Sequence, residues 1–429
     1  MRPELRAYAC PAPGCGWEGE FDPAFVAWCR ACGHNAQPAT DTFVLDEKPK
    51  KTAKRRRREA AETERALRLY EGLAAGADAR PESRLRWAVA GFSVAVHVPF
   101  ALLLAGAATW LAVQPGNWFA WLGALIAVCL AGAVRPQFGR GPRGRGWYRR
   151  DDFPELFALL ERVAAAVGAE PPVAVAFTSA VNASTARVGL RRQRVLVIGI
   201  PLWTILTGPE RVALLAHEMG HQVNGDATHG TLAYSVQASL AEWEAILDPR
   251  GARNGNHDGT DLGGIVFVAH LLLPVILFPF YAAVRGLRLL HGRIWTASRP
   301  RAEYLADTIA ARVASTDAAV ALLDKAVLAD TAANFLTRRG SKAGTDLWGD
   351  LRAYIDGLPE HERERLQFND EATGAAVDST HPPTHLRRKL LAEAAPLPAE
   401  LAPTEAEWAK VDGEMALVGE ALARDLRLM

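Results

Sequence analysis

The sequence predicts an α+β protein that is mostly helical and built in separate parts. Two short cysteine pairs open the chain, two long uncharged apolar runs follow, and a larger domain with mixed patterning comes last. The average composition is uninformative, because 49% hydrophobic residues at a net charge of +1 conceal this segregation. The expected parts are a cysteine-rich module at 1–45, a basic linker and helix at 46–84, a helical hairpin at 85–134, a main domain at 135–396 and a C-terminal helix at 397–429.

The cysteine pairs are separated by thirteen residues, and a glycine follows each pair: Cys10 and Cys15, then Cys29 and Cys32. Four thiolates at such spacing complete a closed tetrahedral site, so the pattern resembles a zinc ribbon and predicts one structural Zn²⁺. Two disulfides or four unrelated thiols are the alternatives, and disulfides are disfavoured in a reducing compartment. Trp17 and Trp28 are expected to form the small core of this module.

A basic run precedes the apolar segments, with eight Lys or Arg residues between positions 48 and 58. Such clusters favour anionic lipid headgroups and keep their side of a membrane protein in the cytoplasm. A solvated linker is the alternative, and nucleic acid is a less favoured partner. Residues 1–40 have no apolar segment behind a basic start, so no signal peptide is expected.

Residues 87–113 and 118–134 contain no formal charge. A membrane-spanning helix needs about 20 apolar residues, so this pattern predicts a transmembrane helical hairpin with its turn at 114–117. Both outer flanks are basic and the turn is uncharged, which places the turn outside and both chain ends in the cytoplasm. The expected location is therefore the cell membrane, with several crossings; a buried soluble hairpin is the alternative.

A histidine pair dominates the main domain. His217 and His221 are four residues apart on a predicted helix, so both imidazoles can reach one ion, and Glu218 points at the same site. Thr207–Glu210 has the pattern of a capping box at the start of this helix, and Asn224–Gly225 is expected to end it. This arrangement is typical of a catalytic zinc site with its own base; the alternative is an amphipathic helix with two solvated histidines.

A catalytic zinc takes three protein ligands and keeps one open position for water, so a third ligand is required from elsewhere. Glu303, on a second predicted helix, is the candidate. Asp307 lies one turn further on the same face, where it could accept a hydrogen bond from a ligand histidine. An ordinary solvated helix face is the alternative for both carboxylates.

Three motifs together resemble a known family: HEMGHxxxxD at 217–226, AEYLAD at 302–307, and Thr380-His381-Pro382-Pro383 with Arg387. In this order they resemble the HtpX-type membrane zinc endopeptidases and the related CAAX-prenyl endopeptidases, over roughly residues 150–395. The resemblance implies a zincin (gluzincin-like) domain. It also implies that His381 stabilises the oxyanion, whereas Arg387 is expected to orient the loop that carries it. A turn with chance histidines is the alternative.

Two short strands are predicted at 173–177 and 195–198, after an amphipathic helix at 152–167. They bracket Asn182 and Ala183, a pair that resembles the family's substrate-binding element beside an edge strand. An ordinary turn asparagine is the alternative.

The uncharged run 264–284 raises a question of topology. A single complete crossing between His221 and Glu303 would place ligands of one metal on opposite sides of the membrane. Either the run enters and returns by bending at Pro274 and Pro279, or it lies half-embedded against the hairpin, or residues 229–247 supply a second crossing. The last option is disfavoured because Glu242 and Glu244 would lie in the membrane. A membrane-associated helix is therefore expected at 264–284.

Together these features predict a membrane-bound zinc endopeptidase that cleaves unfolded or membrane-protein segments at the cytoplasmic face, with Glu218 as general base. The alternatives are a non-catalytic membrane scaffold that recruits partners through its ribbon and basic linker, and a site-2-type intramembrane protease. Polypeptide substrates and the lipid bilayer are the expected partners; nucleic acid is not expected, and the oligomeric state is open. The expected cofactors are one catalytic and one structural Zn²⁺.

Overall fold

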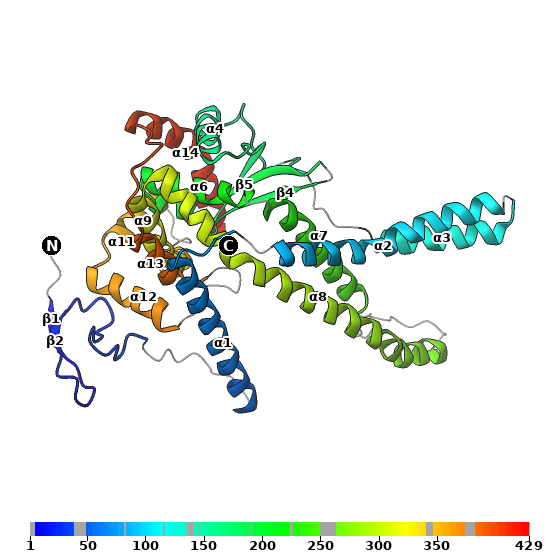
Figure 1. Cartoon of the computed structure of the whole chain (residues 1–429), viewed down its shortest axis with the longest axis horizontal. Coiled ribbons are helices and arrows are strands. Elements are labelled where there is room, and N and C mark those ends of the chain that lie inside the picture. Colours follow the sequence, from blue (N-terminus) through cyan, green and yellow to red (C-terminus); the bar gives the residue numbers. More distant parts are fainter. Residues whose placement is uncertain are drawn as a thin grey trace.

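The structure is a computed structural model that describes residues 5–37, 49–80, 83–114, 116–133, 135, 141–144, 146–189, 191–223, 226–248, 263–339, 346–373 and 382–428. A compact group of helices around a small sheet forms the main domain, and two helical arms extend from it (Figure 1). One arm is the helix pair α2 and α3, and the other is the first half of the long helix α8. The cysteine-rich module lies beside α12, on another side of the domain.

The N-terminal module contains two antiparallel strands, β1 (Arg6–Ala9) and β2 (Glu18–Phe21). Helix α1 (Pro49–Ala74) follows and includes most of the basic run. Its last turns dock on the main domain, where the Tyr70 hydroxyl donates a 2.6 Å hydrogen bond to the Glu393 carboxylate. The linker and the predicted lead-in helix therefore form one helix that reaches the domain.

Helices α2 (Ser83–Val113) and α3 (Trp118–Ala133) pack against each other. Asn117 closes the turn between them, because its side-chain oxygen caps the backbone N–H of Phe119 at 3.0 Å. Within the described residues, the Trp87–Val113 stretch of α2 is long and apolar enough to cross a membrane by length and composition. The apolar stretch of α3, Trp118–Cys129, is shorter.

The main domain begins with α4 (Pro154–Val167), whose apolar face enters the core. A three-stranded sheet follows, formed by β3 (Ala174–Thr178), β4 (Ala183–Val188) and β5 (Gln193–Gly199). The strand order is β3-β5-β4, with β3 parallel and β4 antiparallel to β5. Asn182 and Ala183 were predicted to lie between two strands, whereas Ala183 and Ser184 begin β4, an outer strand of this sheet.

Helices α5 (Ile200–Ile205) and α6 (Gly208–Val223) follow the sheet. The Thr207 N–H donates to the Glu210 carboxylate at 2.7 Å, which is one half of the predicted capping box. Helix α6 is buried along almost all of its length, between α4, α8 and α9. The expected helix end at Asn224–Gly225 lies outside the described residues.

Helices α7 (Asp226–Ile246) and α8 (Gly263–Ala314) form an antiparallel pair. Gln237 contacts Arg288 and His291, whereas Glu244, two turns later, contacts Arg285 and Arg288. The chain therefore leaves the domain along α7 and returns along α8. Of the alternatives for this segment, a run that bends back at Pro274 and Pro279 is excluded, because α8 continues as one helix through both prolines.

The remaining helices complete the core: α9 (Thr316–Ala326), α10 (Ala329–Arg339), α11 (Leu347–Asp356), α12 (Glu360–Thr373), α13 (Thr384–Glu393) and α14 (Glu405–Leu428). Leu160, Leu196 and Leu215 are fully buried at the centre, where α4, β5 and α6 meet. The predicted C-terminal helix is α14. It packs on α6 through an ion pair of 2.8 Å between Arg211 and Asp412.

Candidate metal centre

The centre lies between α6 and the last third of α8, which pack closely against each other. Gly220 makes this close approach possible, because a methyl group in its place would lie 3.3 Å from the Ala306 Cα atom. His217 and Glu303 are buried, and His221 is partly exposed. The crossing of two helices thus brings together residues that are more than 80 positions apart in the chain.

The three candidate ligands face one another. The Nε2 atom of His217 lies 3.5 Å from one oxygen of Glu303, and the Nε2 atom of His221 lies 3.6 Å from the other. Zinc binds such atoms at about 2.0–2.2 Å, so two ligands of a tetrahedral ion are roughly 3.3–3.6 Å apart. The donor types and their spacing therefore fit one zinc ion, and all three ligand atoms lie within 4.8 Å of one another.

Asp307 and Arg387 form a chain of polar contacts that begins at His217. The Oδ1 atom of Asp307 lies 3.0 Å from the Nδ1 atom of His217, on the ring edge away from Glu303. Arg387 donates two hydrogen bonds to the Asp307 carboxylate, at 2.7 and 2.6 Å. Arg387 therefore forms a buried ion pair with α8, and the loop that it was expected to orient lies outside the described residues.

Burial and neighbouring charged groups have opposite effects on the pKa values of the side chains in this centre. Burial alone would lower the pKa of His217, but hydrogen bonds to Asp307 and Glu303 outweigh it and raise the pKa to about 10. Burial lowers the pKa of His221 to about 3, which favours the neutral imidazole that a metal requires. Burial also acts against ionisation of Asp307, yet the Arg387 guanidinium outweighs it and lowers the pKa of Asp307.

Glu218 is buried on the same helix, next to strand β4. The Thr185 hydroxyl donates to the backbone carbonyl of Glu218 at 2.9 Å and lies 3.5 Å from its Oε2 atom. Thr185 was not predicted as a site residue, because β4 was not predicted. Its position two residues after Ala183, on the same face of a strand, would have indicated it.

The remaining predicted site residues are Asn182, Ala183 and His381. Asn182 is exposed, and its side-chain oxygen accepts a 2.8 Å hydrogen bond from the Ala183 N–H at the start of β4. Ala183 is buried in the main core and is the first residue of β4, the strand that contacts α6. The pair therefore lies at the start of this strand. His381 lies outside the described residues.

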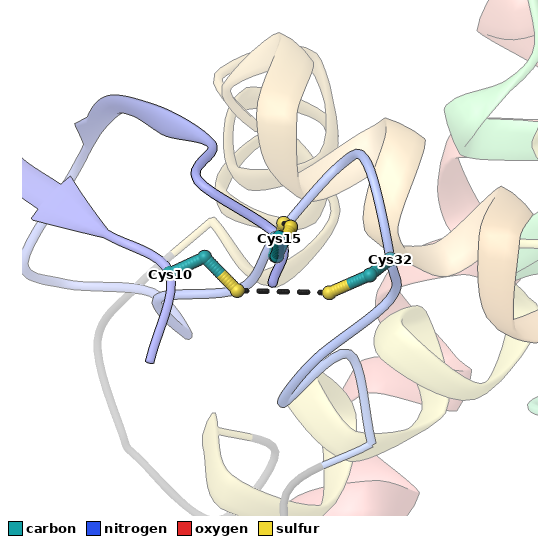
Figure 2. Close-up of side chains that lie close together, drawn as sticks. Cys10, Cys15 and Cys32 are labelled. Carbon is teal, nitrogen blue, oxygen red and sulfur yellow. Dashed lines mark hydrogen bonds between the residues drawn. The ribbon is translucent and has the colours of Figure 1, made fainter. Parts of the chain in front are cut away.

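A second group of candidate ligands lies in the N-terminal module. The Sγ atoms of Cys10 and Cys32 are 3.6 Å apart (Figure 2). The Sγ atoms of Cys15 and Cys29 are also 3.6 Å apart. All four are free thiols whose sulfur atoms lie within 4.8 Å of one another. Zinc–sulfur bonds of about 2.3 Å place the sulfurs of a tetrahedral site roughly 3.8 Å apart, so this cluster also fits a zinc ion.

The aromatic residues of the module differ in role. Trp17 packs on Tyr8 within the module, as expected of a small core. Trp28 is buried and also reaches out of the module, because its indole N–H donates to the His361 carbonyl at 3.0 Å and its ring packs on Phe368. This side chain therefore anchors the module to α12.

Comparisons with known proteins find a family that matches the main domain. The sequence model of peptidase family M48 matches residues 151–395. A protease HtpX homolog from Desulfatibacillum aliphaticivorans is 27% identical over 251 residues, which cover 56% of this chain and 69% of that protein. A comparison with solved structures found no match.

Proposed function

The chain belongs to peptidase family M48, and from this membership we propose that it is a membrane-bound zinc endopeptidase. Its substrates would be unfolded polypeptides or segments of membrane proteins, cleaved at the cytoplasmic face. The family and the name of the relative support a membrane metalloprotease in general. The observation that carries the proposal is the convergence of His217, His221 and Glu303 on one point.

His217, His221 and Glu303 would hold the metal. A zinc ion bound there would polarise the peptide carbonyl and lower the pKa of its bound water to around 7. Glu218 would accept the proton of the attacking water and pass it to the leaving amine. Asp307 would hold the His217 ring in place, and Arg387 would keep Asp307 charged.

Substrate would lie along β4 in extended form, through main-chain hydrogen bonds with the outer edge of the sheet. Such binding depends little on the side chains of the substrate, so many different sequences could be cleaved. Asn182 and Ala183 are proposed to contact substrate at the end of this strand. His381, by the family resemblance, would donate to the developing oxyanion.

Membrane attachment is proposed through α2 and α3, with the apolar half of α8 beside them. α2 has the length and composition of a spanning helix, and large apolar side chains are exposed along α3, including Trp121, Leu125 and Ile126. Basic residues on both flanks of this helix pair favour a cytoplasmic main domain.

Two alternatives remain distinct from this proposal. A site-2-type protease would carry its HExxH helix inside the bilayer, yet Arg211 of α6 is buried in an ion pair with Asp412 of the main domain. A non-catalytic scaffold would not need the buried Glu218 or the converging ligands. Metal analysis separates the scaffold, because we expect about two zinc ions per chain rather than one.

The direct test is Glu218→Gln in the purified full chain in detergent. This variant is expected to keep its bound zinc and to lose cleavage of an unfolded reporter protein by several orders of magnitude. Glu242→Gln, on α7, is the matched control and is expected to cleave normally. Undiminished turnover by Glu218→Gln would refute the assigned base.

A further inference from the structure

Helix α12 lies between the N-terminal module (residues 5–37) and helix α13 (Figure 1). Of the described residues of α12, Leu366 is the one that packs against the main core. Phe368, the other large apolar side chain of this helix, packs on the Trp28 ring of the module instead. Part of what holds α12 in place therefore comes from the module.

The contacts with α12 come from the segment around the second cysteine pair. The Trp28 indole N–H donates to the His361 carbonyl at 3.0 Å. The Ala36 carbonyl accepts two hydrogen bonds from α12, at 2.7 Å from Arg365 and at 2.9 Å from Asn369. Four thiolates that share a metal ion fix the segment that carries them, because small metal sites of this kind fold around their metal. A metal in the module would therefore fix the surface on which α12 docks.

The next residue of α12, Asp370, contacts α13. Its Oδ2 atom accepts a 3.0 Å hydrogen bond from the His385 N–H, in the first turn of α13. The N–H groups of a first helical turn have no partner within the helix, and Pro383, which precedes α13, supplies no side-chain cap. A carboxylate at this end is also favoured by the helix dipole. Asp370 therefore caps α13 from a neighbouring helix.

Arg387 follows His385 by two residues and donates to both carboxylate oxygens of Asp307, which contacts His217. We propose that Asp370 is a positioning residue of the metal centre, and that the N-terminal module fixes its place through α12. The inference rests on the proposed function only in that the centre must bind a metal. Metal affinity at the centre is then expected to fall when either the cap or the docking of the module is removed.

The test measures metal binding rather than cleavage. The purified full chain in detergent is stripped of metal and titrated with Co²⁺ as the probe. The two sites differ in ligand type, four thiolates in the module against two imidazoles and one carboxylate in the centre. Thiolate ligands add a strong charge-transfer absorption to bound Co²⁺, so the spectrum follows the occupancy of the two sites separately.

Asp370→Ala removes the cap and is expected to weaken Co²⁺ binding at the centre about 2- to 30-fold, with little change at the module. Asp370→Asn keeps an oxygen that can accept from the His385 N–H, so it is expected to retain most of the affinity. Asp346→Ala is the matched control, because Asp346 caps α11 through the Gly349 N–H, away from the centre. This control is expected to bind Co²⁺ at the centre as the wild-type chain does.

Gly33→Ala tests the docking of the module. Gly33 and Gly14 each lie next to a cysteine with a positive φ, +72° and +78° respectively. Of these two, an added Cβ at Gly33 would collide with the Phe368 ring of α12, whereas one at Gly14 would meet nothing within 4 Å. Gly33→Ala is therefore expected to weaken Co²⁺ binding at the centre about 2- to 30-fold relative to Gly14→Ala.

The role of Asp370 would be overturned by wild-type affinity at the centre in Asp370→Ala, by an equal loss in Asp370→Asn, or by an equal loss in Asp346→Ala. Equal affinity in Gly33→Ala and Gly14→Ala would overturn the role of the module. If the centre binds Co²⁺ and these differences appear without any Glu218-dependent cleavage, only the proposed activity fails. If the centre of the wild-type chain binds no Co²⁺, both proposals fail.

Discussion

Arg387 on α13 donates hydrogen bonds to both carboxylate oxygens of Asp307 on α8, at 2.7 and 2.6 Å. Asp307 in turn contacts the Nδ1 atom of His217 on α6. The orientation of the His217 imidazole therefore depends on α13, the helix that carries Arg387. This relationship gives Arg387 a physical role that the motif alone did not reveal.

Asp307→Asn is expected to weaken metal binding. The amide would lose the negative charge that holds the His217 ring and would leave Arg387 poorly paired. Loss of such a supporting carboxylate lowers metal affinity about 10–100-fold, which chelator competition can measure. Asp324→Asn is the control, because Asp324 pairs with Arg388 away from the centre. Unchanged affinity in Asp307→Asn would contradict the supporting role.

Thr185→Val is expected to lower kcat with little change in KM. The substitution keeps the side-chain shape and removes the hydroxyl that donates to the Glu218 backbone carbonyl and lies 3.5 Å from its carboxylate. Such an interaction contributes about 0.5–1.5 kcal/mol. The corresponding fall in kcat is about two- to tenfold. Thr185→Ser keeps the hydroxyl and should restore most of the rate. An equal loss in both variants would point to packing of β4 instead.

Gly33→Ala is expected to loosen the N-terminal module from α12. Gly33 has a φ of +72°, and an added Cβ would collide with the Phe368 ring. Gly14→Ala is a matched control, because Gly14 has a φ of +78° and nothing within 4 Å of an added Cβ. Hydrogen exchange of residues 360–373 should accelerate only in Gly33→Ala, by about 1–3 kcal/mol of lost protection. Equal exchange in the two variants would argue against docking.

Glu407→Gln is expected to destabilise the protein at neutral pH and not in acid. Hydrogen bonds from the Thr404 backbone and hydroxyl, and then Arg162, lower the pKa of Glu407 in the folded state. Its stabilisation is therefore complete above the unfolded pKa of 4.5 and is lost as the pH falls through the lower folded value. Melting temperatures at pH 7 and pH 3 should show a deficit that disappears in acid. Glu405→Gln, in the same helical turn, serves as control.

The metal centre was accessible from sequence because its geometry is mostly local. The i, i+4 spacing of His217 and His221 fixes their common face, and the capping pattern at Thr207–Glu210 fixes where α6 begins. Glu303 was identified only by requiring a third ligand and by family resemblance. Its convergence with the two histidines then rests on how α6 crosses α8.

Other features had no local signal. The β4 segment is Ala-Ser-Thr-Ala-Arg-Val, which lacks the alternation of a half-buried strand and is held by its pairing with β5. Helix α8 contains Pro274, Pro279 and Pro300, which usually end helices, so its 52-residue length was not predicted. Trp28 meets its partner helix more than 330 positions later in the chain, and no sequence pattern reports such a contact.

Gly220 has a consequence for the spacing of the candidate ligands. Its missing side chain lets α6 approach α8, and a methyl group there would force the Ala306 backbone to shift by a few tenths of an ångström. Bond lengths in zinc coordination tolerate only about 0.2 Å of error. Replacing the Gly220 hydrogen by a methyl group is therefore expected to alter the spacing between the histidines of α6 and Glu303 of α8, although neither Gly220 nor Ala306 is a candidate ligand.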